Sequence, residues 1–547
     1  MVILFLQALV DAYKEICNAI WHGEERIKIS DALSEIQPGK VTIVRLPTGY
    51  GKSAITLALL YYISNGNFEF GKSVIHVLPM RTIIEDLSQR IIVDTRNLGI
   101  NNNLRIKAQY MSEPGSPFFF HECVITTVDT FLMNFYKIPA VEFEKFVRFG
   151  FTHFELARSQ IYTSSVIFDE FHLFTPSLIK NVRECESNIF HAAVACIACL
   201  ASSGVPVVLM TATMPTATID SIVSTLKERN VSSSLVDYNA DDESFERRER
   251  KIYSSILDAK VDDVAEVVKK NGHGKIIVVM NTPNRAVRVY RSLDDRVPKF
   301  LIHGKVDELK RKELWINIKK ALDDSGDVIV VSTQVIESGV DVSFDYMVTD
   351  GCPADRLIQR AGRVARKDEK SVGDIVILHD RKGYCPYDEK IVELTIEKVE
   401  ANGFPTEFGI VKRFVDSVYP DHEITGSIAS IFFESLDEYV ASGPKISTEY
   451  LNKYGSFARC SGLVKGFPPN ADNSKKFVPI DEDEAIELFT KHNRRLVKVR
   501  ADGKLVFEQT NFTFRGRGSF SFWLTEKGYE GIELPSYDEE IGYVPPM

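Results

Sequence analysis

The sequence predicts an α/β protein with two tandem domains built on parallel sheets, followed by a mixed C-terminal region. Three observations support this prediction: strand-like runs rich in Val and Ile alternate with helical stretches, the alternation occurs twice, and it ends near Pro386. Apolar strands without polar alternation are typical of parallel sheets that helices cover on both faces. A chain of 547 residues has room for several such domains.

Composition narrows the class of protein. Hydrophobic residues make up 44% of the chain and charged residues 26%, as in ordinary globular proteins. The net charge of −10 gives no global sign of nucleic-acid binding, although a basic groove can lie on an acidic protein. The eight cysteines show no disulfide framework, which predicts a cytoplasmic location. Because the first residues lack a basic leader and a turn breaks the longest apolar tract, we expect no signal peptide and no membrane contact.

The first domain carries a phosphate-binding pattern. It consists of a strand (Val41–Val44), a glycine turn (Thr48–Gly51) and a helical stretch (Ser53–Tyr62). This is the cradle of P-loop NTPases, in which Lys52 reaches the β- and γ-phosphates and the Ser53 hydroxyl holds Mg²⁺. The strict pattern has glycine where Leu46 stands, but a chance Gly-Lys-Ser turn is disfavoured by the flanking strand and helix. The residues expected to bind ATP with Mg²⁺ are Thr48, Gly49, Tyr50, Gly51, Lys52 and Ser53.

Further strands organise both domains and set their predicted limits. The first domain continues with strands at Ser73–Leu78, Cys123–Thr126, Ser165–Phe168 and Pro206–Met210. After a polar linker at Val236–Lys251, the second has strands at Lys275–Met280, Lys299–Ile302, Asp327–Val331, Asp345–Thr349 and Asp374–Leu378. The second domain has no Gly-Lys-Ser/Thr loop, so one nucleotide is expected at the interface of the two. We predict domains at 1–238, 239–385 and 386–547.

The third region gives weaker signals. Tyr387–Val418 has helical periodicity. Strand-like pieces follow at Leu496–Val499, Leu505–Gln509 and Phe520–Leu524. No motif in this region indicates a chemical role.

Adjacent carboxylates follow the strand Ser165–Phe168. Asp169 and Glu170 would lie at the carboxyl end of a parallel strand and point into the same crevice as the P-loop. Asp169 would then hold Mg²⁺ beside Ser53, and Glu170 would polarise the attacking water. A solvated acidic turn is the alternative, but it fits poorly after an apolar strand.

Two further motifs complete the candidate site. The hydroxyls of Thr211 and Thr213 can hydrogen-bond back to Glu170 or His172 and so pass the nucleotide state to a nucleic-acid groove. In the second domain, Gln359 begins a segment that puts Arg363 and Arg366 three residues apart, on one face of a predicted helix. Guanidinium forks suit charge that develops on a γ-phosphate, whereas the alternative is a basic solvated helix.

Together these motifs resemble superfamily-two helicases, over roughly residues 40 to 380. That family tolerates loss of the first P-loop glycine, and the resemblance implies two RecA-like domains. It implies nucleic-acid backbone contacts from Pro79, Arg81, Thr126, Thr127, Asn281, Thr282 and Thr333. It also places Asp341 near the ribose, and implies γ-phosphate contacts from Gln359, Arg363 and Arg366.

A finer resemblance is to the CRISPR-associated helicase of type I systems. It is carried by Val331–Asp345, by Thr349–Arg366, by Asp169-Glu-Phe-His172 and by Leu78-Pro-Met-Arg-Thr-Ile-Ile-Glu-Asp86. In that family an RNA-guided surveillance complex opens the DNA, and the helicase is recruited to unwind and degrade it. Usual members carry an N-terminal His-Asp nuclease domain, but only about 40 residues precede the P-loop strand here. The likeness is therefore to the split form, whose nuclease is a separate subunit.

The leading hypothesis is an ATP-dependent single-stranded-DNA translocase and 3′-to-5′ helicase for CRISPR interference. An RNA helicase or a DNA-repair helicase on the same scaffold is the alternative, because the core motifs contact the backbone and do not identify the sugar. A binding module that no longer hydrolyses ATP is disfavoured because Lys52, Asp169, Glu170 and Arg366 are all present.

Overall fold

The computed structural model divides into two compact units. It describes residues 2–79, 81–100, 104–110, 113–174, 188–239, 242, 245, 249–270, 274–324, 326–337, 342–366, 370–419, 463–469, 471–500, 502–514 and 519–545. Unit 1 contains the described residues within Met1–Ser177, Glu186–Arg248 and Glu407–Thr448. Unit 2 contains those within Glu249–Thr406 and Glu449–Met547.

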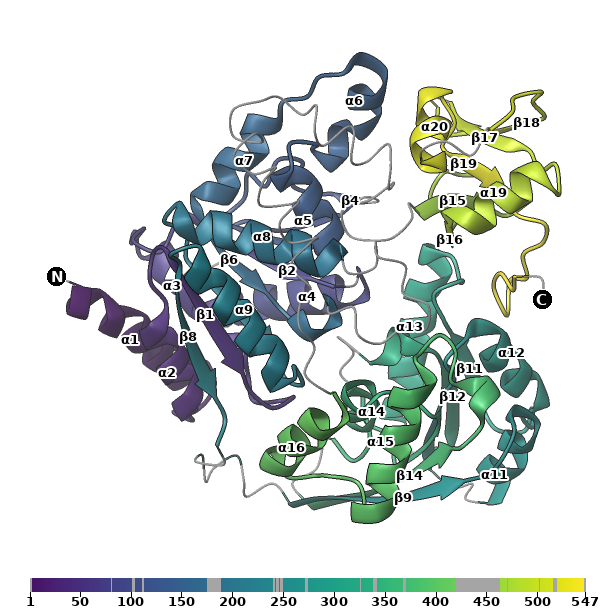
Figure 1. The fold of residues 1–547 in the computed structure, drawn as a ribbon, viewed down its shortest axis with the longest axis horizontal. Helices are drawn as coiled ribbons and strands as arrows, with labels where there is room; N and C mark the ends of the chain where they lie inside the picture. Colours follow the sequence, from purple (N-terminus) through teal and green to yellow (C-terminus); the bar gives the residue numbers. More distant parts are fainter. Residues whose placement is uncertain are drawn as a thin grey trace. The chain divides into compact units, whose positions relative to one another are not determined.

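Unit 1 is built on an eight-stranded sheet in the order β4-β3-β5-β2-β6-β7-β1-β8. Figure 1 shows part of this sheet, with β1, β2, β6 and β8 labelled. Its strands are β1 (Lys40–Arg45), β2 (Ser73–Leu78), β3 (Ile106–Tyr110), β4 (Glu113–Pro114), β5 (Cys123–Thr127), β6 (Ser164–Phe168), β7 (Val207–Thr211) and β8 (Ser232–Asp237). All pairs are parallel except β3 with β4. The predicted parallel α/β fold of this domain is confirmed.

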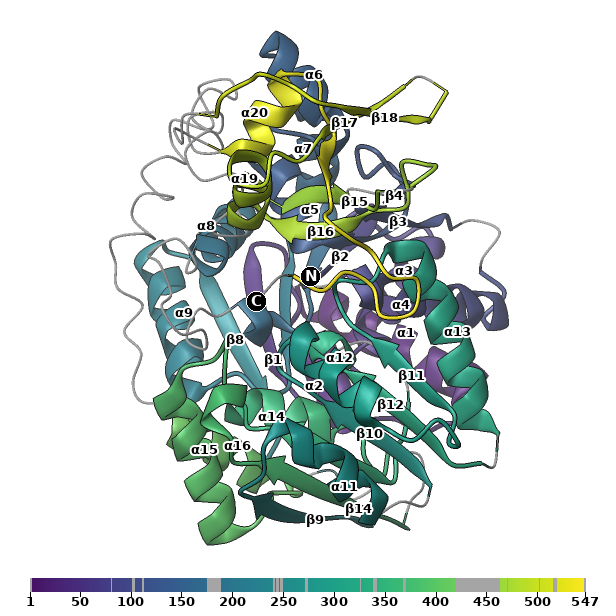
Figure 2. The same ribbon diagram turned by 90° about the vertical axis from the view of Figure 1, so that its right-hand side faces the viewer.

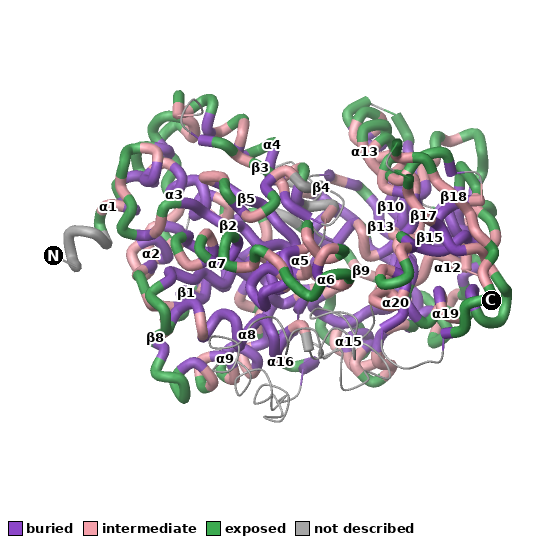
Figure 3. Tube along the Cα trace, turned by 90° about the horizontal axis from the view of Figure 1, so that it is seen from above, coloured by how far each residue is buried: buried purple, intermediate pink, exposed green. Residues whose placement is uncertain are grey.

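Helices form the layers on this sheet. Those that pack on one another beside the P-loop strand are α1 (Val2–Ile20), α2 (Ile27–Glu35), α3 (Ala54–Ser64) and α4 (Arg81–Asn97). The others in this half of the chain are α5 (Val128–Phe135), η2 (Ala140–Glu142), α6 (Phe143–Phe149), α7 (Phe154–Tyr162), η3 (Phe171–Phe174), α8 (Asn188–Ser202) and α9 (Thr216–Glu228). Figure 3 shows buried residues concentrated in the strands and exposed residues on the surrounding helices and loops.

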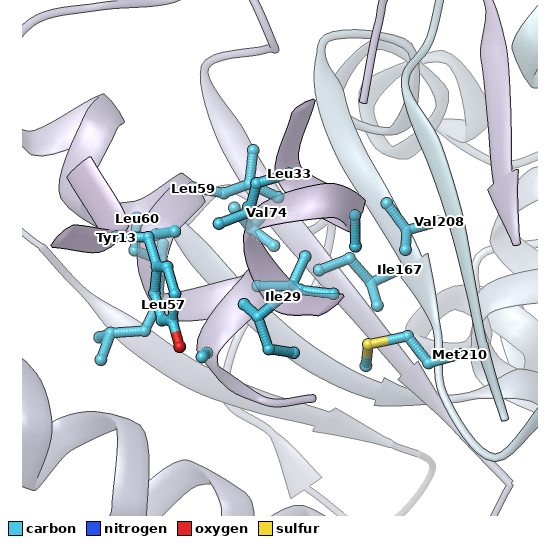
Figure 4. Packing of buried hydrophobic residues seen from close by; sticks show 14 of the residues in the cluster. Tyr13, Ile29, Leu33, Leu57, Leu59, Leu60, Val74, Ile167, Val208 and Met210 are labelled. Atoms are coloured by element: carbon cyan, nitrogen blue, oxygen red, sulfur yellow. The ribbon is translucent and has the colours of Figure 1, made fainter. Parts of the chain in front are cut away.

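The core of unit 1 joins α1–α3 to the central strands. Figure 4 shows Tyr13, Ile29 and Leu33 packed with Leu57 and with residues of β2, β6 and β7. Helix α3 is apolar almost all round, because it lies between the sheet and the helices α1 and α2. This burial fixes the start of α3, and therefore the end of the P-loop, against the sheet.

Unit 2 contains a parallel six-stranded sheet in the order β11-β12-β10-β13-β14-β9. Its strands are β9 (Glu249–Leu257), β10 (Lys275–Val279), β11 (Lys299–Ile302), β12 (Val328–Ser332), β13 (Tyr346–Asp350) and β14 (Lys370–Leu378). The helical elements are η5 (Val261–Asp263), α11 (Val264–Lys270), α12 (Pro283–Ser292), α13 (Glu308–Asp323), η6 (Gln334–Ile336), α14 (Ala354–Ala361), η7 (Arg381–Gly383) and α15 (Glu389–Asn402). The polar stretch predicted as linker thus contains the end of β8 and the start of β9, both edge strands.

A mixed five-stranded sheet completes unit 2, in the order β16-β15-β19-β17-β18. Its elements are β15 (Leu463–Phe467), β16 (Val478–Asp481), α19 (Glu482–Thr490), β17 (Leu496–Val499), β18 (Leu505–Glu508), α20 (Phe520–Glu526) and β19 (Gly531–Glu533). The strand predicted at Phe520–Leu524 is wrong. Ser519 caps a helix there by accepting a hydrogen bond from Phe522 N, and Phe520 and Leu524 are buried one turn apart.

The last residues of the chain tie this mixed sheet to the parallel sheet of unit 2. His303 Nε2 lies 2.9 Å from Ile541 O, and Tyr543 N donates to Lys305 O at 2.9 Å. The Lys305 ammonium lies 3.1 Å from Glu484 on α19. Figure 2 shows the C-terminal stretch, in yellow, passing beside β11.

Helix α16 (Phe408–Val418) belongs to unit 1, although it follows the second sheet along the chain. Lys412 Nζ lies 2.6 Å from Asp237 Oδ2, and Asp416 accepts hydrogen bonds from the amide and hydroxyl of Thr216. The domain limits at 238 and 385 stay predictions, to which the structure adds this return of the chain. None of the described helices is long and apolar enough to cross a membrane.

Candidate nucleotide-binding site

The P-loop connects β1 to α3 and owes its shape to two glycines. Gly49 and Gly51 have φ angles of 84° and 95°, which favour glycine, and a Cβ on either would meet no atom within 4 Å. Leu46 replaces the expected first glycine and is fully buried, so this position supports the core. The Lys52 ammonium donates to the carbonyls of Leu46 and Pro47 at 3.0 and 3.2 Å. The loop therefore holds its own lysine in the place where phosphate oxygens would compete for it.

Tyr50 anchors the P-loop from inside the protein. Its side chain is buried, its hydroxyl donates to Asp242 Oδ2 at 2.6 Å, and it accepts from Lys28 N at 3.2 Å. The rings of Tyr238 and Phe245 meet it edge-on at 5.4 and 4.9 Å. Burial, together with the Asp242 carboxylate, raises the pKa of Tyr50 far above its ordinary value. The segment that follows β8 thus fixes the conformation of the loop.

Asp169 and Glu170 follow β6 at the carboxyl edge of the same sheet, as predicted. Glu170 has a φ of 50°, a left-handed conformation that is unusual outside glycine, and its amide donates to Asp169 Oδ1 at 2.8 Å. Strained backbone of this kind gathers at functional sites, where it aims a side chain. The other carboxylate oxygen, Asp169 Oδ2, lies 3.4 Å from His76 Nε2.

The pKa of Asp169 shows that its surroundings favour the charged form. Burial alone would raise this pKa, but the hydrogen bond and charge of His76 and the charge of Lys52 outweigh burial and lower it. The influence of Lys52 also means that the P-loop and the acidic motif lie close together. A carboxylate held ionised beside a lysine is suited to bind a divalent cation.

The residues predicted to hold Mg²⁺ fit that ion. Ser53 stands at the N-cap of α3, yet its hydroxyl makes no capping hydrogen bond. A hydroxyl and a carboxylate are the hard oxygen ligands that Mg²⁺ takes, with nucleotide oxygens and waters filling the other positions. Within the described ranges, no cluster of three or more His, Cys, Asp or Glu residues could hold a metal ion.

The structure brings together two of the predicted coupling residues, His172 and Thr211. His172 is buried, with Nδ1 3.2 Å from Thr211 Oγ1 and 3.5 Å from Glu170 Oε2. Thr213 is also buried, two residues further along the chain. The link from β7 to the acidic motif is thus present, whereas its use in signalling nucleotide state stays a prediction.

The nucleic-acid residues predicted in the first domain are only partly available. Pro79 and Arg81 precede and begin α4, and Arg81 lies over the Tyr110 ring at 5.9 Å. The Thr126 hydroxyl is buried and donates to Gln109 O at 2.6 Å, so a phosphate contact from this side chain is not supported. Thr127 caps α5 by accepting from Thr130 N, so this side chain is bonded within the domain and its phosphate contact stays a prediction.

The residues predicted to contact nucleic acid in the second domain also make hydrogen bonds within their own domain. Asn281 is buried, and its amide donates to Gly351 O and Gly383 O at 2.8 and 2.7 Å. Its side chain therefore holds two loops together, and its phosphate contact stays a prediction. Thr282 caps α12 by accepting from Arg285 N, and Thr333 is buried at the end of β12. Asp341, predicted near the ribose, lies outside the described residues.

The arginine motif does not form one helical face. Helix α14 ends at Ala361, so Arg363 and Arg366 lie beyond it, whereas Gln359 is buried inside it. The buried Arg363 guanidinium donates to Ile336 O at 3.0 Å and to Glu337 O at 2.8 Å. Arg366 is half-buried and its amide donates to Ser343 Oγ at 2.9 Å. The γ-phosphate roles of these residues stay predictions.

Sequence reasoning missed the arginine at the centre of this motif. Arg360 is fully buried, and it donates to Glu337 Oε1, Thr349 Oγ1 and Asn281 Oδ1, each at 2.8 Å. Glu337 is also fully buried and accepts from Arg356 at 3.3 Å. The available signal was Glu337, which directly follows the apolar pair Val335-Ile336. A charged side chain buried beside apolar residues needs a buried partner of opposite charge.

Comparisons with known proteins agree with this architecture. The DEAD/DEAH box helicase model matches residues 29–222, and the model of the C-terminal part of the CRISPR-associated nuclease/helicase Cas3 matches residues 272–369. A putative CRISPR-associated nuclease/helicase Cas3 of Methanocaldococcus jannaschii is 26% identical over 60% of this chain and 43% of its own length. The CRISPR-associated helicase Cas3 of Thermoproteus tenax is 25% identical over 70% of this chain and 64% of its own.

Solved structures show the same fold. The crystal structure of T. fusca Cas3 aligns with a TM-score of 0.63 at 16% identity, over 92% of this chain and 70% of that one. Its ADP and ATP forms align with TM-scores of 0.61 and 0.55, over 88% and 80% of this chain and 66% and 56% of theirs. The two RecA-like domains predicted from the sequence are therefore confirmed as a fold.

These findings define the class of relatives: residues 29–222 match a DEAD/DEAH box helicase model, residues 272–369 match a Cas3 C-terminal model, and the chain shares the fold of T. fusca Cas3. Within this class they confirm the resemblance to the CRISPR-associated helicases, because the second-half model and both curated relatives are of the Cas3 type. The chain spans 43% and 64% of the length of these two relatives.

Proposed function

We propose that the chain hydrolyses ATP to move along single-stranded DNA and to unwind target DNA in the 3′-to-5′ direction during type I CRISPR interference. One observation carries the proposal. Lys52, Asp169 and Glu170 meet at one edge of the first sheet, in a chain whose second half matches the Cas3-type model. The match to T. fusca Cas3 in its ADP and ATP forms supports a nucleotide in this fold.

The residues divide the work of hydrolysis. Lys52 would exchange its two carbonyl partners for β- and γ-phosphate oxygens, while Ser53 and Asp169 would hold Mg²⁺. When bound, Mg²⁺ neutralises phosphate charge. Glu170, aimed by its left-handed backbone, orients the attacking water and accepts its proton. Arg366, as the candidate finger, would stabilise the charge that develops on the γ-phosphate.

Nucleic acid would be held through its backbone. The amides at the starts of α5 and α12 and the guanidinium of Arg81 offer donors that suit phosphate oxygens. Contacts of this kind carry no sequence information, so binding should depend steeply on salt and little on base sequence.

The proposal includes three circumstances of the reaction. An RNA-guided type I surveillance complex delivers the opened DNA, and a separate His-Asp nuclease subunit cuts the displaced strand. The reaction takes place in the cytoplasm, which the scattered cysteines suit. A preparation of the chain should therefore displace strands yet leave labelled single-stranded DNA intact with Mn²⁺, Ni²⁺ or Co²⁺. Cleavage that stays with the chain through purification would contradict the separate nuclease.

The deciding experiment is a single-turnover ATPase assay with single-stranded DNA or RNA, with Lys52→Ala as the control. We expect hydrolysis that DNA stimulates and that the control abolishes, followed by unwinding of duplexes with a 3′ tail and not of those with a 5′ tail. Stimulation by RNA alone would favour the RNA-helicase alternative. Nucleotide binding without hydrolysis would favour a scaffold role.

A further inference from the structure

A histidine inside the first sheet links the P-loop helix to the acidic motif. His76 is fully buried in β2, where the other residues are mostly apolar, and both of its ring nitrogens have polar neighbours. Its Nδ1 lies 2.9 Å from the hydroxyl of Thr56 on α3, and its Nε2 lies 3.4 Å from Asp169 Oδ2. A buried imidazole is costly to place unless its nitrogens are bonded, so this position is not explained by packing alone.

The chemistry of Asp169 and Thr56 determines which ring nitrogen of His76 carries a proton toward Asp169. An ionised carboxylate only accepts hydrogen bonds, so Nε2 carries the proton that it donates to Asp169. The Thr56 hydroxyl can donate to Nδ1 or accept from it, and either arrangement leaves the Nε2 donor in place. The link to Asp169 is therefore independent of the charge on the ring.

We propose that His76 is a positioning residue that orients Asp169 for Mg²⁺ and, through Thr56, ties that carboxylate to the helix that carries Ser53. The two residues expected to hold the metal would then be joined by a chain of side chains, in addition to the metal itself. The inference rests on the proposed ATPase function.

The arrangement around Asp169 supports this assignment. The Glu170 amide holds Oδ1 at 2.8 Å and His76 faces Oδ2, so both carboxylate oxygens have a fixed donor. Thr56 lies one helical turn after Ser53, so a shift of α3 that moves Ser53 also moves Thr56. Partners of metal ligands of this type commonly change metal affinity by about 10–100-fold when removed.

Two substitutions separate positioning from packing. His76→Gln places an amide N–H near the position of Nε2 and so keeps a donor for Asp169, whereas His76→Asn reaches only the position of Nδ1. We expect His76→Asn to raise the Mg²⁺ concentration for half-maximal ATPase by about tenfold or more, with His76→Gln close to wild type. Thr56→Val should shift it in the same direction by a smaller factor.

A second readout does not depend on turnover. Electron paramagnetic resonance can count Mn²⁺ bound to the chain with a non-hydrolysable ATP analogue. We expect the Mn²⁺ affinity of His76→Gln to be close to that of wild type, that of Thr56→Val to be lower and that of His76→Asn to be lowest. His191→Asn is the matched control, because His191 is another buried histidine and lies on α8 outside this chain of contacts. The melting temperature checks that each variant folds. If His76→Asn does not fold, Thr56→Val tests the inference in its place.

The outcomes are distinguishable. If wild-type chain fails to bind Mn²⁺ with the analogue, the proposed function fails, and this inference with it. If wild type binds but the Asn and Gln variants match each other, or Thr56→Val leaves the Mn²⁺ affinity unchanged, His76 is structural only and the inference is overturned while the proposed function stands.

Discussion

The P-loop residues of the first domain keep polar groups available for a ligand, whereas most motif residues of the second domain bond to their own domain. Ser53 makes no capping bond, and Lys52 donates to two loop carbonyls that phosphate can replace. In the second domain Asn281, Arg360 and Arg363 are buried and bonded to neighbouring loops. The contrast predicts that equally recognisable motifs serve chemistry in one domain and rigidity in the other.

The largest effect that would test this contrast is expected at Glu170. Glu170→Gln keeps the shape of the side chain but loses the base, so turnover should fall by about 10²–10⁴-fold while ATP binding is retained. Single-turnover hydrolysis and nucleotide titration measure the two quantities separately. Near-normal turnover would remove Glu170 from the catalytic role and would weaken the contrast between the domains.

The arginines of the second domain should give the opposite pattern. Arg360→Ala leaves Glu337 buried with only Arg356 beside it, so the free energy of unfolding should fall by about 3–5 kcal/mol. Arg366→Ala should leave stability near wild type but lower hydrolysis by on the order of 10³-fold, if it is the finger. Chemical denaturation and ATPase rates measured on both variants decide the matter. Loss of hydrolysis without loss of stability in Arg360→Ala would break the contrast.

The fold was readable from the sequence wherever strands are buried on both faces. β2 has the predicted limits and β10 differs from its predicted limits by one residue, because continuous apolar runs mark strands inside a parallel sheet. β8 and β9 were missed because each is an edge strand with a polar sequence, Ser-Ser-Ser-Leu-Val-Asp in the case of β8. The stretch predicted as a strand at 520–524 is helix α20, because Phe520 and Leu524 are four residues apart and Ser519 caps the helix.

The site was readable where a motif is local in the sequence. The P-loop and the adjacent carboxylates have fixed spacing and fixed chemistry, so their residues could be named in advance. His76 and Glu337 have no such spacing: their partners lie 93 and 23 residues away. A lone polar residue in an apolar strand indicates that a partner exists, but only the fold identifies the partner.

A pH dependence should sharpen the view that unit 2 uses its buried polar groups for stability. Burial lowers the pKa of His303 to about 4, and its Nδ1 accepts from Lys305 N at 3.2 Å, which requires a neutral ring. The ordinary pKa is about 6.5, so between pH 6.5 and 4 the unfolded chain binds a proton that the folded chain does not. The contribution of the neutral His303 ring to the free energy of unfolding should therefore be fully present above pH 6.5. It should fall by up to about 3 kcal/mol toward pH 4.

The variant His303→Gln isolates this effect, because its amide can still donate to Ile541 O but does not titrate. Denaturation of unit 2 at pH 7.5 and 5 should show a smaller pH dependence in the variant than in wild type. His191 also has a pKa lowered to about 4 by burial, but it lies in unit 1 and is unchanged in the comparison. If the free energy of unfolding changes equally with pH in the variant and in wild type, the ring of His303 is not held neutral.

The smallest effect is expected at Tyr50, whose hydroxyl acts on the ligand site only through the loop. Tyr50→Phe keeps the ring contacts with Tyr238 and Phe245 but loses the hydrogen bond to Asp242. Asp242 still accepts from Phe245 N at 3.1 Å, so the fold should tolerate the change. Loss of this hydrogen bond should make the ordered P-loop less favourable by about 1 kcal/mol. The KM for ATP should then rise by about fivefold, and kcat should stay nearly unchanged.

Substitutions of the partner carboxylate test whether this effect comes from the hydrogen bond. Asp242→Asn keeps an oxygen that can accept from the Tyr50 hydroxyl, so its KM should fall between those of wild type and Asp242→Ala. Combining Tyr50→Phe with Asp242→Ala should add little, because both changes remove the same contact. Full additivity of the two changes in KM would show that Tyr50 and Asp242 act on the loop independently. The P-loop would then be held by ring packing, and the first domain's site would be anchored by its core alone.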